Sequence, residues 1–263
     1  MGKFLNHYSL IARVYPALLT LAPALWSALV LFPRLTSNVR LGAASTLSVG
    51  CMFYLLASLA RSRGKSMERE LIALWGGWPT TLLLRHRDTT IDPITKARYH
   101  QALAEVGKLG VLPTEAQEIA APNDANHAYR SATRRLIELR RGKTFQMVED
   151  ENASYGFRRN LFGLKVVAIA VAGLSAIATG LVWLAELPKP INMEGLERSI
   201  TTYPYLPALL LSDLAYMLMF VLLIGREFVR QAADEYALAL FRTLDQAPAQ
   251  SPKRRTRAPR SGS

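Results

Sequence analysis

The sequence is poor in cysteine, since Cys51 is the only one among 263 residues. One cysteine excludes a disulfide within the chain and a metal site built from several cysteines. The histidines of the middle region also lack the spacing of metal ligands; they are His86, His100 and His127. We therefore expect no metal ion and no other cofactor.

Recognisable catalytic motifs are missing as well. The sequence contains no Gly-x-Ser-x-Gly, no Walker lysine loop and no Rossmann glycine pattern. His86, Arg87 and Asp88 spell the tripeptide of a protein-kinase catalytic loop. Pro93, however, stands where that loop needs a magnesium-binding Asn, and no glycine-rich strand, strand lysine or Asp-Phe-Gly is found. We therefore expect no catalytic residues, and a membrane-bound enzyme ranks last among the functions considered.

Charge is nearly absent from four long runs. Each run has about the 20 predominantly apolar residues that a helix needs to cross roughly 30 Å of hydrocarbon. The runs are Val14 to Phe32, Leu41 to Ala60, the stretch from Lys165 to near Glu186, and Tyr205 to Ile224. This pattern predicts an all-α membrane protein with four transmembrane helices and a helical cytoplasmic domain between the second and third spans.

The first two runs differ in the residues that govern helix packing. Pro16 and Pro23 would kink the first helix, which is tolerated when neighbouring groups bind the carbonyls that proline leaves free. The second run carries small residues that suit close contact between helices in lipid; they are Gly42, Ala43, Ser45, Ser48 and Gly50.

Basic residues predict the orientation. The formal net charge is +12, and lysine and arginine gather in the middle region and near both termini. The two short connectors hold only Arg34, Arg40, Lys189 and Arg198. Because basic residues favour the cytoplasmic side, both termini and the middle region should face the cytoplasm. Part of the positive charge would then contact anionic lipid.

Local signals divide the chain further. The second span should continue beyond the membrane and stop at Gly76 and Gly77, and Asp92 should cap a helix that begins at Pro93. After the fourth span an apolar stripe at helical spacing predicts one more helix; it consists of Phe228, Ala232, Tyr236, Ala239 and Leu240. The segments expected are a two-span hairpin (1–60), a helical basic domain (61–160), a second hairpin (161–225), a cytoplasmic helix (226–246) and a disordered basic tail (247–263).

Two basic clusters in the middle region are candidates for ligand binding. Arginine binds phosphates through its planar fork, and aromatic rings can stack on bases. The candidate residues are Arg85, Arg87, Lys96, Arg98, Arg130, Arg134 and Arg141. If the clusters converge, most plausibly around an oligomer axis, they would form a positive vestibule for a nucleotide or short single-stranded nucleic acid. The alternative is a solvated helix face with pairs such as Arg134 to Glu138.

Asp213 lies about nine residues into the fourth run, near the bilayer centre. A charged group costs several kcal/mol there, so Asp213 should face other helices or water. Tyr216 is a candidate hydrogen-bond partner if it projects the same way. Asp213 thus either holds helices together through hydrogen bonds or provides a carboxylate that lines a pore or pathway.

Two stretches carry a resemblance to a known class. "WPTTLLLRHRDTTIDPITKARYH" and "EDENASYGFRRNLFGLK" together resemble bacterial inner-membrane proteins found with anti-phage defence genes. The layout is similar to transmembrane effectors gated by nucleotide messengers, including the Hailong-type channel subunit. The resemblance implies a homo-oligomeric channel or membrane-disrupting effector that acts in antiviral defence. The alternative is a non-conducting membrane scaffold or sensor that recruits partners through its basic domain.

Overall fold

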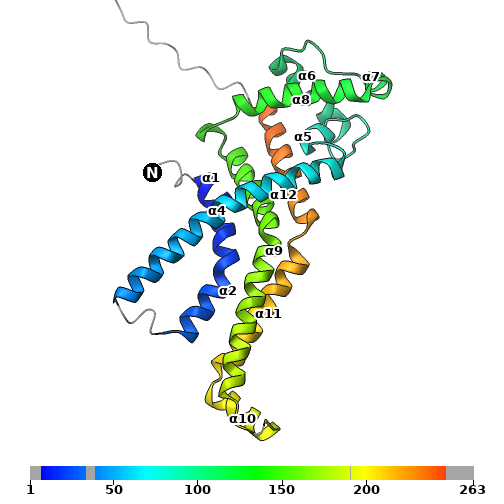
Figure 1. The fold of residues 1–263 in the computed structure, drawn as a ribbon. Helices are drawn as coiled ribbons and strands as arrows, with labels where there is room; N and C mark the ends of the chain where they lie inside the picture. Colours follow the sequence, from blue (N-terminus) through cyan, green and yellow to red (C-terminus); the bar gives the residue numbers. More distant parts are fainter. Residues whose placement is uncertain (1–6, 34–38, 190, 247–263) are drawn as a thin grey trace, which may run out of the picture.

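The computed structural model describes residues 7–33, 39–189 and 191–246, without the side chains of residues 39–45 and 143. All regular secondary structure in these ranges is helical, as the sequence predicted (Figure 1). The tail predicted to be disordered, 247–263, lies outside the described residues.

The apolar part of the molecule is a bundle of three long elements, which we call the bundle. The first comprises α1 (His7–Ser9), a π-helical turn (Leu10–Val14) and α2 (Tyr15–Leu31). The others are α9 (Gln146–Glu186) and α11 (Tyr205–Leu223), joined by α10 (Met193–Thr202). In the described part of the chain, three helical stretches are long and apolar enough to cross a membrane: His7–Leu31, Gln146–Glu186 and Tyr205–Leu223. They cover the first, third and fourth predicted spans, except for the last residue of the first and of the fourth.

Within the described residues the sequence prediction of four such helices is corrected to three. The second predicted span, 41–60, lies within α4 (Val39–Trp75), a helix of 37 residues. The first half of α4 combines apolar residues with serine and glycine, and its second half is rich in charge. α4 diverges from α2 toward its own N-terminal end (Figure 1), and Leu47, Met52 and Leu55 are exposed there.

Glycine sets the point where α4 crosses α9. A Cβ at Gly163 would lie 2.6 Å from the backbone nitrogen of Gly64, so neither helix tolerates a side chain at this contact. Beside it, Arg159 Nη1 and the Tyr155 hydroxyl both donate to Glu68 Oε1, at 2.8 and 2.7 Å. The second stretch that carries the resemblance thus forms the crossing between α4 and α9.

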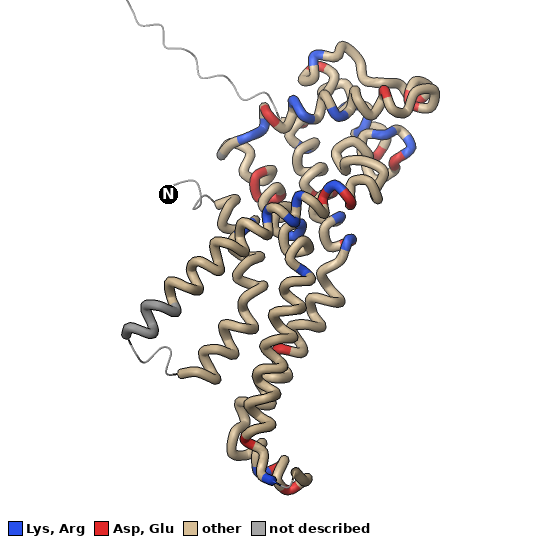
Figure 2. The backbone as a smooth tube through the Cα atoms, viewed as in Figure 1, with Lys and Arg blue, Asp and Glu red and all other residues tan. Residues whose placement is uncertain are grey.

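The remaining elements form a second layer, which we call the head. It comprises α5 (Pro79–Leu82), α6 (Pro93–Gly107), α7 (Glu115–Ala120), α8 (Pro122–Leu139), a 3-10 turn (Lys143–Phe145) and α12 (Arg226–Arg242) with the 3-10 turn Thr243–Asp245. Figure 2 shows charged residues in the head, at its boundary with the bundle and near α10, with few between.

Local signals placed several of these elements correctly. α4 ends at Trp75, and Gly76 and Gly77 follow with φ of 76° and 146°, which glycine adopts without strain. Asp92 caps α6, because its Oδ1 accepts from the Thr95 backbone N–H at 2.9 Å. α8 begins at Pro122, which suits a first helical position because proline lacks an N–H.

Within the head, α12 shares one core with the helices of the middle region, although the sequence divided them at residues 160 and 226. Leu240 and Phe241 of α12 are fully buried against α6 and α8, where they meet Leu103, Tyr129 and Leu136. The predicted stripe on α12 is confirmed for Ala232, Ala239 and Leu240, which are all buried. α12 therefore links the end of α11 to the centre of the head.

Candidate functional site

Two prolines shape the first helix of the bundle and leave backbone carbonyls without their usual donors. Proline has no N–H, so Pro16 and Pro23 free the carbonyls four residues earlier, at Ala12 and Leu19. Asn160 Nδ2 donates to the Ala12 carbonyl at 2.6 Å, and the Tyr216 hydroxyl donates to the Leu19 carbonyl at 2.6 Å. α9 and α11 thus each satisfy one break in the first helix.

Tyr216 therefore does not serve the role considered for it beside Asp213. Its hydroxyl is directed to Leu19 of α2, and Asp213 has other partners. The Asp213 side chain is only 2 % exposed, and its Oδ2 accepts from Ser27 Oγ at 3.2 Å and from Thr179 Oγ1 at 3.5 Å. Asp213 faces other helices, as its position in an apolar run predicted.

A chain of hydroxyls extends from this carboxylate. Ser175 Oγ donates to Ser27 Oγ at 2.6 Å and also lies 3.3 Å from the Pro23 carbonyl oxygen. We call Ser27, Ser175, Thr179, Asp213 and the Pro23 carbonyl the Asp213 cluster. Its members come from α2, α9 and α11, so the three apolar helices meet at one polar point. None of the ion pairs in the described residues involves Asp213.

A cavity of about 180 Å³ opens beside the Asp213 cluster. It lies between α2 and α11, and its walls are Ala22, Pro23, Trp26, Ser212, Asp213 and Tyr216. The carboxylate-bearing residue therefore joins the hydroxyl chain to a space that holds several water molecules by volume.

The head contains a second candidate site, a cleft of about 520 Å³. This volume is in the range of small-molecule sites. The cleft is lined by Gly76, Arg85, His86, Arg87, Glu115, Glu118, Ile119, Pro122, Asn123 and Asn126. Arg85 donates from Nε to Asn126 Oδ1 at 3.0 Å and from Nη2 to the Gly76 carbonyl at 3.3 Å. Burial and the neighbouring Arg87 lower the pKa of Arg85, so an anion in the cleft would relieve unfavourable interactions of this guanidinium.

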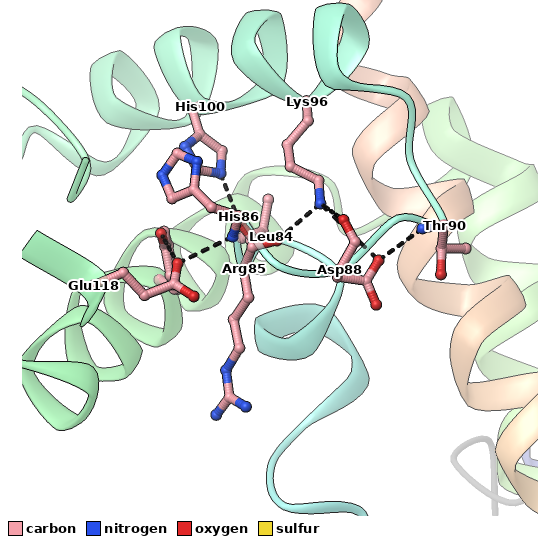
Figure 3. Close-up of polar contacts among 9 residues, drawn as sticks. Leu84, Arg85, His86, Asp88, Thr90, Lys96, His100 and Glu118 are labelled. Carbon is pink, nitrogen blue, oxygen red and sulfur yellow. Dashed lines mark hydrogen bonds and ion pairs between the residues drawn. The ribbon is translucent and has the colours of Figure 1, made fainter. Parts of the chain in front are cut away.

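A buried polar network supports the wall of this cleft (Figure 3). Glu118 is buried, and it accepts from the His86 backbone N–H at 3.0 Å and from the Tyr129 hydroxyl at 2.8 Å. The imidazoles of His86 and His100 meet edge to face, with centroids 4.9 Å apart. Burial raises the pKa of Tyr129 and lowers the pKa of His100. The network holds the 84–88 loop against α6, α7 and α8.

Lys96 belongs to this network and not to the cleft. Its Nζ donates to the Arg85 carbonyl at 2.8 Å and to the Asp88 carbonyl, and it lies 4.0 Å from the Asp88 carboxylate. Burial lowers its pKa, while Asp88 and Glu118 oppose that effect. Lys96 is thus a support for the loop that carries Arg85 and Arg87.

The other predicted ligand residues point elsewhere. Arg98 pairs with Asp245 at 2.8 Å, and the Arg130 guanidinium lies 5.8 Å from the centroid of Trp78. Arg134 is exposed on α8, whereas Arg141 lies beyond the end of that helix and so does not continue its stripe. Within one chain the structure brings only Arg85 and Arg87 into the cleft.

Several residues that carry these sites were missed by sequence reasoning. Ser27, Ser175 and Thr179 read as ordinary small polar residues of apolar helices, and Glu118 and Asn126 gave no motif. The only usable signal was the pair of prolines in the first helix, which predicts freed carbonyls but not their donors.

Comparison with protein-family models, with curated proteins and with solved structures found no match.

Proposed function

We propose that the chain is a subunit of an oligomeric inner-membrane channel or membrane-disrupting effector. In this proposal the bundle and the first half of α4 cross the membrane, and the head lies in the cytoplasm. The head controls the spans by binding a nucleotide or short single-stranded nucleic acid in the cleft. Antiviral defence is the biological setting that the sequence resemblance supports.

The observation that carries the proposal is the position of the cleft at the end of α4. Gly76 follows the last residue of α4 directly and lines the cleft, and its carbonyl accepts from Arg85. A phosphate group that binds Arg85 bidentately would compete for the same guanidinium donors. Release of Gly76 would loosen the end of a helix that continues without a break to Val39. Ligand binding is thereby linked to the segment 41–60.

A second contact transmits the same movement. α4 touches α9 backbone to backbone at Gly64 and Gly163, and Glu68 is bound by Arg159 and Tyr155 of α9. α9 is a single helix of 41 residues that reaches from the head through the bundle. A shift of α4 is therefore passed to the helix that contributes Ser175 and Thr179 to the Asp213 cluster.

The test combines binding with ion flux in liposomes that contain the purified protein. We expect cyclic nucleotides or short single-stranded DNA to bind with an affinity that falls steeply with salt and to change the flux. Arg85→Ala combined with Arg87→Ala should remove binding, whereas Arg134→Ala, an exposed arginine outside the cleft, should retain it. Liposomes that stay impermeable under all these conditions would contradict the channel. Equal loss in Arg134→Ala would replace the cleft by a vestibule shared between subunits.

A second candidate is the non-conducting scaffold, and one feature of the head favours it. A shallow hollow of about 380 Å³ is lined mainly by small and apolar side chains, including Leu109, Val111 and Ala128. Val111 is 79 % exposed, and exposed apolar side chains around a hollow suit an apolar segment of another protein. This function predicts that Val111→Asp abolishes partner binding and leaves liposome permeability unchanged.

A further inference from the structure

We propose that the Asp213 cluster is a binding site for a monovalent metal cation, for which Na⁺ is the probe. The inference goes beyond the proposed function, because the site lies within one chain and needs neither the head ligand nor ion conduction. It rests on the kinds of oxygen present, their spacing, the charge of the cluster and the cavity beside it.

The oxygens are of the kinds that hard cations prefer. The cluster offers one carboxylate, three hydroxyls and one backbone carbonyl, and it contains no sulfur or nitrogen donor. Four of the distances between these oxygens lie between 2.6 and 3.5 Å. Oxygen atoms at these separations can contact one small ion together. They come from three helices, so an ion bound there would tie the bundle together.

The charge of the cluster favours a cation over an empty hydrogen-bonded site. Ser27 and Thr179 both donate to Oδ2 of Asp213, so the partners of this oxygen are neutral hydroxyls. An ionised carboxylate in an apolar bundle needs a partner of opposite charge, and no ion pair in the described residues supplies one. One negative charge matches a monovalent ion, whereas a divalent ion would leave a positive charge uncompensated.

The cavity gives such an ion a way in. Asp213 and Pro23 are members of the cluster and also line the cavity of about 180 Å³ between α2 and α11. The same wall holds Ser212 and Tyr216, neither of which contributes an oxygen to the cluster. Tyr216 keeps its hydroxyl on the Leu19 carbonyl, so it borders the route without closing the cluster.

The test measures the thermal stability of the full chain in detergent while NaCl replaces N-methyl-D-glucamine chloride at constant ionic strength. A ligand that binds only the folded state raises Tm with saturation, here by about 5 °C at high occupancy. Asp213→Asn should remove the Na⁺-dependent rise. Ser212→Ala is the matched control, because this neighbour lines the cavity but adds no oxygen to the cluster, and it should keep the full rise.

A second measurement covers the case in which Asp213→Asn does not fold. Thr179→Val and Ser27→Ala each remove one hydroxyl group with little other change in the side chain. Each should raise the half-saturating Na⁺ concentration roughly tenfold or more. Direct binding of ²²Na⁺ to the wild-type chain should saturate at one ion. The proposal is overturned if Tm follows ionic strength and not Na⁺. It is also overturned if Asp213→Asn keeps the response, or if stability depends on pH alone, which would show a protonated carboxyl group.

Discussion

A buried lysine and a buried aspartate lie in the two regions of this molecule, and their surroundings differ. Lys96 in the head is 5 % exposed, and Asp213 in the bundle is 2 % exposed. The Lys96 amino group has two backbone carbonyls and the Asp88 carboxylate around it. The Asp213 carboxylate has only hydroxyl donors. The lysine is compensated by the fold itself, whereas the described residues give the aspartate no cationic partner.

A similar difference separates four other polar side chains from Asp213. In the head, His86 and His100 bind the carbonyls of Pro113 and Leu84. In the bundle, Asn160 and Tyr216 bind the carbonyls that proline leaves free. Each of these groups satisfies a specific backbone atom that would otherwise be buried without a partner, which costs about 1–3 kcal/mol. A polar group with such a task is structural, and the Asp213 carboxylate has none.

The largest effect is expected from Lys96→Met. Methionine preserves much of the volume but removes the donor, so the carbonyls of Arg85 and Asp88 lose their shared partner. We expect the head to lose about 3 kcal/mol of stability. Hydrogen exchange of the α6 and α8 amides would measure this loss. Lys65→Met on the exposed face of α4 is the control and should change stability by no more than about 0.5 kcal/mol. If Lys96→Met lost no more stability than this control, water would have replaced the lysine amino group.

The contact between α4 and α9 gives the next largest effect. Gly163→Ala would place a Cβ 2.6 Å from the Gly64 nitrogen and 2.9 Å from the Arg63 carbonyl carbon. Backbone atoms cannot move aside as a side chain can, so we expect a loss of about 2–3 kcal/mol in the thermal stability of the whole chain. Gly173→Ala, in the same helix with nothing within 4 Å of the added Cβ, should be neutral or stabilising by up to about 1 kcal/mol. Equal effects at both positions would show that the helices are not in contact.

The local features of this fold were predictable because their partners are close in sequence. The cap at Asp92 involves an N–H three residues away, and the end of α4 follows from two adjacent glycines. The apolar runs identified the helices of the bundle by composition alone. The second predicted span is the exception, because it lies in α4, a single helix that runs on from the apolar stretch into a charged second half.

The sites themselves depend on contacts between distant residues. Asn160 reaches Ala12 across 148 positions, and Tyr216 reaches Leu19 across 197. Arg98 finds Asp245 147 positions away, which removes it from the predicted ligand site. Basic clusters in sequence show where arginine is available, but not which acceptor it binds. Asp213 was identifiable because a charge in an apolar run is unusual wherever its partners lie.

A change of pH tests the histidine part of the network. Burial lowers the pKa of His100, whose ring also faces His86, Lys96 and Glu118. In the unfolded chain this histidine has its ordinary pKa of about 6.5. As the pH falls, the unfolded chain therefore takes up a proton before the folded chain does. Stability of the head should be constant above that pH and fall below it, toward the folded pKa, by at most about 1.4 kcal/mol per pH unit for one proton. His100→Gln should reduce this slope in hydrogen exchange between pH 7 and 5, and an unchanged slope would assign it to other groups.

The smallest effect is expected from removing the Tyr216 hydroxyl, which donates to the carbonyl that Pro23 leaves free. This experiment distinguishes a structural polar group from a ligand-binding one. Tyr216→Phe leaves the Leu19 carbonyl without a donor and should lower the thermal stability of the bundle by about 1 kcal/mol. Pro23→Ala restores a backbone N–H four residues after Leu19, so the tyrosine hydroxyl is no longer needed. Tyr216→Phe in that background should therefore cost little stability. The coupling energy from the double-mutant cycle should be close to the stability that Tyr216→Phe alone loses.

Neither variant should change the response to Na⁺, because neither removes an oxygen of the Asp213 cluster. Independent effects of the two substitutions would show that the Leu19 carbonyl finds another donor.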